Sequence, residues 1–387
     1  MSAVQAHEAR TERRTSPIEL LWDLVFVFAI TQVTTLLSHD LGWRGLGRSM
    51  LVLALVWWAW SAFVWAANAE EEEAPPPRLI LLVAMVLIFI AGLAIPRAFG
   101  GEATLFAATY AGVRLLHLGL YADASRRGHA AWSAIAGFAL TVGIGMALLV
   151  VGSLLDGWRR DVLWAAAVAI DYAGPGWLTR ARLRGLQEVA VAHFAERYGL
   201  FVIICLGESV VAIGLGASGH PLTARVVAAV GLGLLITAGL WWTYFGRFAS
   251  AAEERLRHHA DPVLAASDAY SYLHLLLVAG IILFAVGVKL LIGGVSRPLG
   301  DAPRLALCGG IALYLLGHAA FRLRLSGTVN IEKLAAAAAL LGLYGLGAHM
   351  PSLWLLSVAT ALVAVLCTLE TAPARSRVRG ERDARRA

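Results

Sequence analysis

The sequence predicts an all-α fold, a polytopic bundle of about twelve transmembrane helices. Its 387 residues are 59% hydrophobic and only 15% charged, and the mean hydropathy is +0.71. That composition is too apolar for a soluble domain of this length. Twelve apolar stretches of spanning length follow one another with short links. A segment inside a bilayer must satisfy its own backbone hydrogen bonds, which favours helices.

The predicted spans are long enough to cross the hydrocarbon core, which takes about 20 residues at about 1.5 Å per residue. They cover residues 18–37, 46–67, 79–95, 103–121, 132–151, 162–178, 199–217, 223–245, 272–292, 304–321, 334–348 and 352–369. The sixth is the least regular, because Gly174-Pro175-Gly176 interrupts it.

The positive residues predict how the chain is oriented. Most of the 32 Lys and Arg residues lie in alternate links, which places both termini in the cytoplasm. Residues 1–17 then form a cytoplasmic N-terminal segment, without the features of a removable signal peptide, and residues 371–387 form a basic cytoplasmic tail. The net charge of +6 is therefore interpreted as an orientation signal and not as a nucleic-acid-binding surface.

Self-comparison predicts two parallel six-span repeats, over residues 18–189 and 190–370. The motif around Asp23 aligns with the one around Glu208, and the Trp pair at 57–58 aligns with the pair at 241–242. Repeats of this kind are common in transporters, where binding sites form between the halves.

Acidic residues inside the spans are the first candidate functional groups, because hydrocarbon makes ionisable groups costly. Ser16, Pro17 and Glu19 match a capping box, so Glu19 is predicted mainly to start a helix. Asp23 lies one turn deeper, beyond capping range, and needs a partner, water or a proton. Glu208 lies near the middle of the seventh span; its alternative role is a neutral acid bonded to one neighbouring helix.

The fourth span carries a polar stripe that includes Arg114 and His117. A guanidinium near mid-membrane must face the interior, so Arg114 is predicted as the counter-charge of Asp23 or Glu208. The alternative is an ion pair that only fixes helix register. His117 and His318 are candidate proton relays, with hydrogen-bonded packing as the other interpretation.

Other polar residues are assigned secondary roles. Asp171 precedes the Gly-Pro-Gly break and lies either at a cavity or at an ordinary helix end. His193, Glu196 and Arg197 precede the seventh span and are predicted to be interfacial charges. The three cysteines have no paired spacing, and no phosphate loop, metal-binding motif or nucleophile elbow is present. We therefore predict no metal, no cofactor, no catalytic residue and no enzymatic activity.

Three segments resemble a known family. Residues 16–32 read SPIELLWDLVFVFAITQ and resemble the opening motif of the bacterial low temperature requirement protein A (LtrA) family. Residues 193–209 read HFAERYGLFVIICLGES and resemble its central signature, and residues 274–289 resemble a third segment. Leu21 and Trp22 depart from the family opening but leave the acids in place. The resemblance covers about residues 16–369 and implies a multi-pass protein of the bacterial inner membrane.

The leading hypothesis is an ion- or proton-coupled transporter or channel-like protein. Asp23 and Glu208 would bind the proton or ion, with Arg114 as their counter-charge. The partners are then the lipid bilayer and an unidentified ion or small solute; no pattern indicates an oligomeric state. The alternative is a structural or cold-adaptation protein whose buried charges fix helix packing. A lipid-modifying enzyme ranks last, because the sequence shows no nucleophile or metal constellation.

Overall fold

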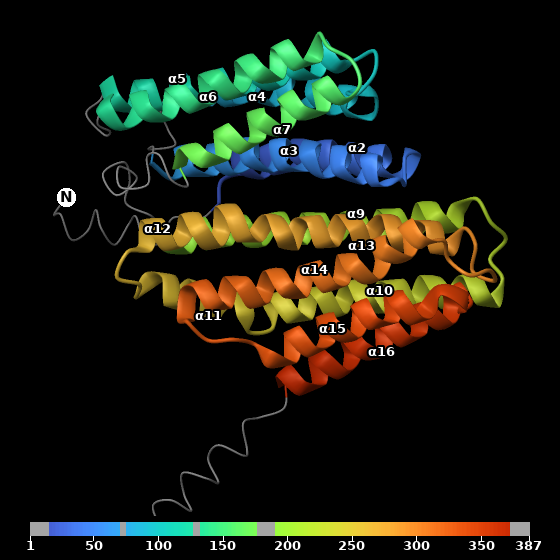
Figure 1. Cartoon of the computed structure of the whole chain (residues 1–387). Helices are drawn as coiled ribbons and strands as arrows, with labels where there is room; N and C mark the ends of the chain where they lie inside the picture. The colour runs from blue at the N-terminus through green and yellow to red at the C-terminus, as the bar shows by residue number, and fades with distance from the viewer. Residues whose placement is uncertain (1–14, 70–74, 127–131, 176–189, 372–387) are drawn as a thin grey trace, which may run out of the picture.

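The protein is a bundle of long helices in the computed structural model, which describes residues 15–69, 75–126, 132–175 and 190–371 (Figure 1). The long helices are α2 (Pro17–His39), α3 (Trp43–Ala69), α4 (Pro75–Ala94), α5 (Ala103–Arg126), α6 (Trp132–Ser153), α7 (Trp158–Ala173), α9 (Val191–Ser218), α10 (Ala224–Phe245), α13 (His274–Ile292), α14 (Asp301–Ser326), α15 (Ile331–Leu346) and α16 (Ser352–Thr371). Shorter elements are η1 (Ile95–Arg97), α11 (Phe248–Arg257), α12 (Pro262–Ala266), η3 (Ser267–Leu273) and η4 (Gly347–His349).

Each of the twelve predicted spans coincides with one of these long helices, although residues 176–178 of the sixth span lie outside the described residues. Within the described part of the chain, ten helices are long and apolar enough to cross a membrane. The other two are α6, whose described apolar stretch is Phe138–Ser153, and the 16-residue α7. The all-α membrane fold is therefore confirmed, with ten candidate spans in place of twelve.

The seventh and ninth spans begin earlier than the hydropathy pattern predicts. Helix α9 begins at Val191, not at residue 199, because Arg197 in its early part is neutralised by Glu19 and Asp23 inside the bundle. Helix α13 continues α12 and a π-helical segment, η3, so that one apolar helical stretch runs over Pro262–Ile292. Trp57 Nε1 donates to the Ser271 carbonyl and Trp65 Nε1 to the Ser271 hydroxyl, both at 2.7 Å. These bonds satisfy backbone and side-chain groups of the irregular turn.

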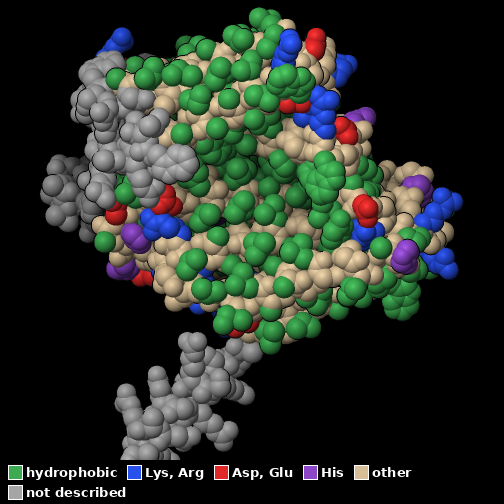
Figure 2. Space-filling view, viewed as in Figure 1, with side chains coloured by type: hydrophobic (Ala, Val, Ile, Leu, Met, Phe, Trp, Pro, Cys, Tyr) green, Lys and Arg blue, Asp and Glu red, His purple; other side chains and the backbone are tan. Residues whose placement is uncertain are grey.

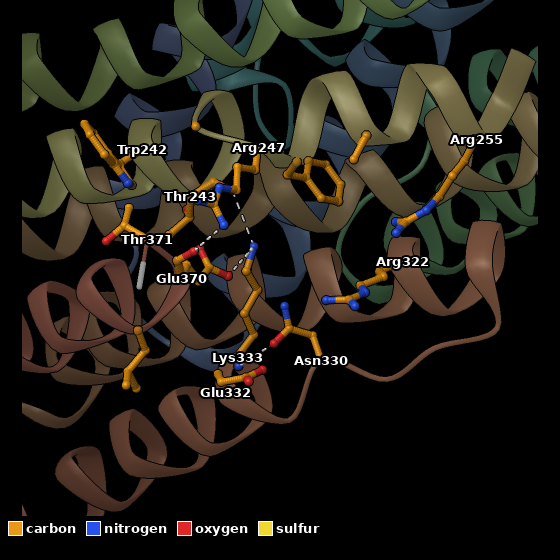
Figure 3. A pocket seen from close by; sticks show the side chains of 14 residues that line it. Trp242, Thr243, Arg247, Arg255, Arg322, Asn330, Glu332, Lys333, Glu370 and Thr371 are labelled. Atoms are coloured by element: carbon orange, nitrogen blue, oxygen red, sulfur yellow. Dashed lines mark hydrogen bonds and ion pairs between the residues drawn. The ribbon is translucent and has the colours of Figure 1, made fainter. Parts of the chain in front are cut away.

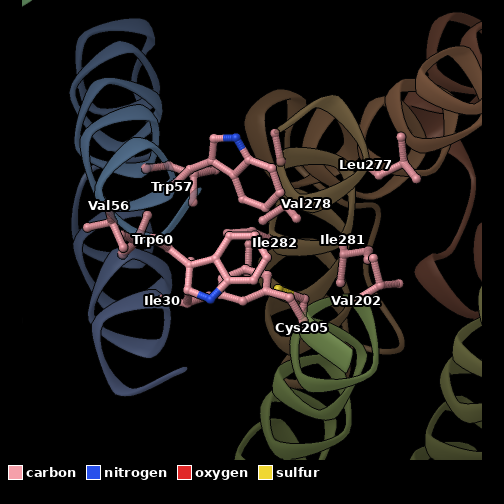
Figure 4. Packing of buried hydrophobic residues seen from close by; sticks show 14 of the residues in the cluster. Ile30, Val56, Trp57, Trp60, Val202, Cys205, Leu277, Val278, Ile281 and Ile282 are labelled. Carbon is pink, nitrogen blue, oxygen red and sulfur yellow. The ribbon is translucent and has the colours of Figure 1, made fainter. Parts of the chain in front are cut away.

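The bundle has two parts that meet along an apolar seam. Figure 1 shows α2–α7 on one side and α9–α16 on the other. At the seam, Trp57 and Trp60 of α3 pack against Val202 and Cys205 of α9 and against the first half of α13 (Figure 4). Trp57 and Trp58 are both buried.

Helices α13 and α14 approach each other through glycines. A Cβ added to Gly280 would lie 2.6 Å from the Gly310 carbonyl oxygen, and one added to Gly310 would lie 2.6 Å from the Phe284 nitrogen. Seven residues after Gly280 in α13, a Cβ added to Gly287 would lie 2.5 Å from the Leu307 nitrogen. Small residues at this spacing allow backbones to pack closely inside a membrane.

The surface fits a lipid environment. In Figure 2 hydrophobic side chains cover the sides of the molecule, while the charged side chains gather at its two ends. The first turn of α2 and the last turn of α16 lie at the same end of the bundle (Figure 1). We call this end the Glu19 end, after the buried acid in the first turn of α2.

Candidate functional site

Two acids and one arginine form a buried ion cluster between α2 and α9. Arg197 of α9 places Nη1 2.7 Å from Glu19 Oε1 and Nη2 2.7 Å from Asp23 Oδ1. All three side chains are at most 3% exposed. One guanidinium therefore bridges two carboxylates of the first helix, at full burial.

Two further side chains complete this ion cluster. His193 Nε2 lies 3.2 Å from Glu19 Oε2, and Trp60 of α3 donates from Nε1 to Asp23 Oδ1 at 2.8 Å. Both residues are buried. We define the α2–α9 cluster as Glu19, Asp23, His193, Arg197 and Trp60.

The charges of the α2–α9 cluster do not balance. Two carboxylates face one permanent cation, so the cluster carries a net negative charge unless a proton or another cation joins it. Asp23 Oδ2 has no hydrogen-bond partner among the described residues. A buried excess charge is costly, so binding one proton on a carboxylate is the simplest way to remove it.

Local sequence places these groups. Both hydrogen bonds of the predicted capping box are present, and Ser16 N donates to Glu19 Oε2 at 2.9 Å. The i, i+4 spacing puts Glu19 and Asp23 on one face of α2, and the same spacing puts His193 and Arg197 on one face of α9. Glu19 therefore starts the helix, as predicted, and also holds an ion pair that the sequence analysis did not predict.

The contacts show that α2 and α9 run parallel. Their polar contacts join residues separated by 174, 174, 174 and 177 positions along the chain. A constant difference requires two helices that point the same way. The chain between the end of α2 and the start of α9 must therefore pass from one end of the bundle to the other an odd number of times. Helices α6 and α7 pack antiparallel along their lengths, with Trp164 Nε1 donating to the Leu149 carbonyl and Gly145 close to the Ala167 carbonyl.

A second carboxyl site lies deeper between the same two helices. Thr31 donates from Oγ1 to Glu208 Oε2 at 2.6 Å, and Thr34 Oγ1 lies 2.8 Å from Glu208 Oε1. Thr34 Oγ1 also lies 2.7 Å from the Thr31 carbonyl. A hydroxyl has only one proton to donate. If Thr34 donates it to the carbonyl, Glu208 must carry a proton and donate to Thr34.

The two acidic sites are separate. Glu208 follows Arg197 by 11 residues, which corresponds to about 16 Å along α9. Buried Ile30 and Cys205 lie with Trp60 in the apolar seam between them (Figure 4). Asp23 and Glu208, aligned in the self-comparison, thus have different partners and do not meet.

The predicted role of Arg114 is wrong. Arg114 Nη2 lies 2.7 Å from Asp171 Oδ1, and both side chains are buried. The counter-charge of Asp23 is Arg197, and Glu208 has threonine partners. Asp171 lies in the last turn of α7. Because it pairs with Arg114, this turn lies at the same height in the bundle as the middle of α5.

The histidines lie in other parts of the bundle. His117 packs among aromatic rings, with ring centroids 5.0 Å from Tyr121 and 5.5 Å from Phe138. His318 of α14 places Nδ1 3.0 Å from the Lys333 ammonium. Neither histidine contacts Asp23 or Glu208, so the structure does not join these four groups into one relay.

The predicted interfacial position is wrong for two of three residues before the seventh span. Glu196 is exposed, but His193 and Arg197 are buried in the α2–α9 cluster. The available signal was their i, i+4 spacing, which matches that of Glu19 and Asp23. Among the described residues no group of three or more His, Cys, Asp or Glu side chains is placed to hold a metal ion.

Comparison with known proteins identifies the family. Residues 14–368 match the family model described as bacterial low temperature requirement A protein (LtrA). The chain belongs to the LtrA family. It is also 31% identical over 276 residues to a protein of Rhizobium meliloti (strain 1021) described as uncharacterized, with 70% of this chain and 67% of that protein covered. No solved structure matches the chain. The membership makes this a multi-pass membrane protein of a bacterial family, in agreement with the sequence resemblance.

Proposed function

We propose that this LtrA-family protein is a proton-coupled transporter or proton-conducting protein in which the α2–α9 cluster is the proton-binding site. One observation carries the proposal: two fully buried carboxylates share a single guanidinium between two parallel helices. Ionisable groups inside a membrane protein commonly mark proton or ion pathways. In this proposal the chemistry occurs at Glu19 and Asp23, and Arg197 takes the role that the sequence analysis assigned to Arg114.

The mechanism follows from the charge count. With both acids ionised, Arg197 binds α2 through two ion pairs. A proton on Asp23 Oδ2 neutralises one of them and leaves the pair with Glu19. Proton binding therefore weakens the contact between α2 and α9, and a conformational equilibrium can be shifted by such a change in contacts.

Glu208 supplies a second proton-binding position in this proposal. Its oxygens and the Thr31 and Thr34 hydroxyls support either the ionised or the protonated acid without movement of heavy atoms. The apolar seam separates Glu208 from the α2–α9 cluster. Transfer between the two sites therefore requires a movement of the helices or the entry of water.

The proposed setting is the bacterial inner membrane, with both termini in the cytoplasm and twelve crossings. The parallel direction of α2 and α9 supports two six-span repeats in the same orientation. On this basis the α2–α9 cluster lies near the cytoplasmic end of the bundle, since that is the Glu19 end.

The test is proton movement in proteoliposomes that contain a pH-sensitive dye. Wild-type protein should carry protons down an imposed gradient faster than empty liposomes, and Asp23→Asn should return the rate to that of empty liposomes. Glu196→Gln, which changes an exposed acid next to Arg197 in the sequence of α9, is the matched control. A readout that needs no solute is the infrared C=O stretch of protonated carboxylic acids, which should titrate with pH in wild type and lose intensity in Asp23→Asn.

A structural role is the second candidate, because the same ion pairs also fix the register of two parallel helices. In that case the neutral variants change thermal stability while wild type moves no protons and shows no titrating carboxylic acid band. That result would remove the transport proposal.

A further inference from the structure

A second polar site lies at the Glu19 end of the C-terminal part, away from the α2–α9 cluster. It is a pocket of about 500 Å³ where the ends of α10, α14, α15 and α16 meet the first turns of α11 (Figure 3). Its walls come from five helices in two separate parts of the sequence, α10 and α11 and then α14 to α16. None of its residues takes part in the proton proposal, so the inference below stands independently.

The pocket is positively charged. Four basic side chains line it, from Arg247, Arg255, Arg322 and Lys333, and they face the two acids Glu332 and Glu370. The lining therefore has two more positive than negative charges. In Figure 3 the Lys333 ammonium and Arg247 converge on Glu370, and Arg255 and Arg322 extend from the other side.

The internal contacts leave two of these cations available to a ligand. The Lys333 ammonium is buried, 3.3 Å from Glu370 Oε1 and 3.0 Å from His318 Nδ1. Arg322 uses only Nε, on Thr328, and Arg255 makes no hydrogen bond or ion pair within the part of the chain that the structure describes. Arg255 and Arg322 can thus offer forked donors, which match the oxygens of a phosphate group.

The pocket also has an apolar rim that is exposed to the side of the bundle. Trp242 is 46% exposed and Leu369 is 57% exposed, and both line it. Tryptophan at a helix end is typical of the membrane interface. Helix α11 continues this surface, with Ala252 and Leu256 buried and Arg255 and Arg257 directed outward. A ligand that combines a phosphate with an apolar body fits both features.

We propose that this pocket binds the phosphate of an anionic phospholipid headgroup, with the acyl chains along Trp242 and Leu369. Basic pockets between transmembrane helices commonly bind acidic headgroups. A bound phosphate would contact α11 through Arg255 and α14 through Arg322. It would therefore add a polar link between α11 and α14, which already meet through the ring contacts of Phe248 with His318 and Phe321.

The test measures lipid binding to the purified full-length protein by native mass spectrometry, with phosphatidylglycerol and phosphatidylcholine as competing probes. Wild type should retain phosphatidylglycerol selectively. Arg255→Gln/Arg322→Gln should weaken its binding roughly tenfold or more, since each basic residue near the surface contributes to the attraction. Arg257→Gln is the matched control, because Arg257 is an exposed arginine of the same helix that pairs with Glu253 and does not line the pocket.

Three outcomes of the lipid-binding measurement would overturn the proposal. These are equal retention of the two lipids by wild type, equal weakening in Arg257→Gln, and no change in the double variant. A separate experiment adds inorganic phosphate or sn-glycerol 3-phosphate, in place of a competing lipid, to protein that holds phosphatidylglycerol. If these soluble anions at millimolar concentration displace phosphatidylglycerol, the site binds a soluble phosphate compound and the lipid proposal is wrong. If the double variant does not fold, Arg255→Gln alone removes an exposed side chain without internal partners and serves in its place.

Discussion

The contact between α2 and α9 and the contact between α13 and α14 join neighbouring helices by opposite means. The first depends on Arg197 held between two acids. The second depends on Gly280 and Gly310, whose missing side chains let two backbones touch. Two backbones that meet at glycines pack closely in only one arrangement. An ion cluster with unequal charges changes its contacts when it gains or loses a proton. The difference indicates that α13 and α14 form a rigid pair, whereas the contact between α2 and α9 can adjust.

The largest effect is expected from removing the shared cation. Arg197→Met leaves Glu19 and Asp23 buried without a counter-charge, which costs about 3–5 kcal/mol of stability. Thermal unfolding in detergent should show a large fall in Tm. The triple variant Glu19→Gln/Asp23→Asn/Arg197→Met should recover most of it, and a failure to recover would show that the loss comes from packing.

A bulky residue at the glycine contact should have the next largest effect. Gly310→Val places new atoms against the Phe284 nitrogen and the Gly280 carbonyl and should cost about 2–3 kcal/mol. Gly309→Val, at the neighbouring position on another face of α14, is the control and should cost less. Unlike the cost at Arg197, this one should be the same at all pH values at which the protein stays folded.

A neutral isostere at the ion cluster should have a smaller, pH-dependent effect. Asp23→Asn keeps the shape and removes the charge, so it loses one of the two pairs with Arg197 but also removes the excess negative charge of the α2–α9 cluster; its stability should therefore differ from that of wild type by no more than about 1–2 kcal/mol. The wild-type acid becomes neutral as the pH falls. The Tm difference between wild type and variant should therefore shrink at low pH, and a difference independent of pH would argue that Asp23 does not titrate.

The hydroxyl contact at Glu208 should matter less for stability. Thr34→Val removes one hydrogen bond between membrane helices, which is worth about 0.6 kcal/mol on average. Thr35→Val, whose hydroxyl bonds only to the Thr31 carbonyl, is the matched control. If Glu208 exchanges a proton, Thr34→Val should alter the pH dependence of proton flux and Thr35→Val should not.

The sequence predicts the fold well because a bilayer imposes a strong and local requirement. Apolar length alone locates the twelve long helices, and the capping box at Glu19 depends on three neighbouring residues. Partner choice is different. Asp23, Glu208 and Asp171 are all acids that Arg114 could pair with, and only the folded bundle, which brings Arg114 of α5 to Asp171 of α7, selects Asp171. Hydropathy also placed Arg197 outside the span, since a residue-by-residue scale cannot include its neutralisation by Glu19 and Asp23.

The separation of 174 residues between Asp23 and Arg197 has a consequence for synthesis. At about 5–20 residues per second, a ribosome needs roughly 10 to 35 s to make that much chain. During this interval Glu19 and Asp23 have left the ribosome and their arginine does not yet exist. The nascent first helix must therefore enter the bilayer with its acids protonated, or remain beside the insertion machinery until α9 arrives.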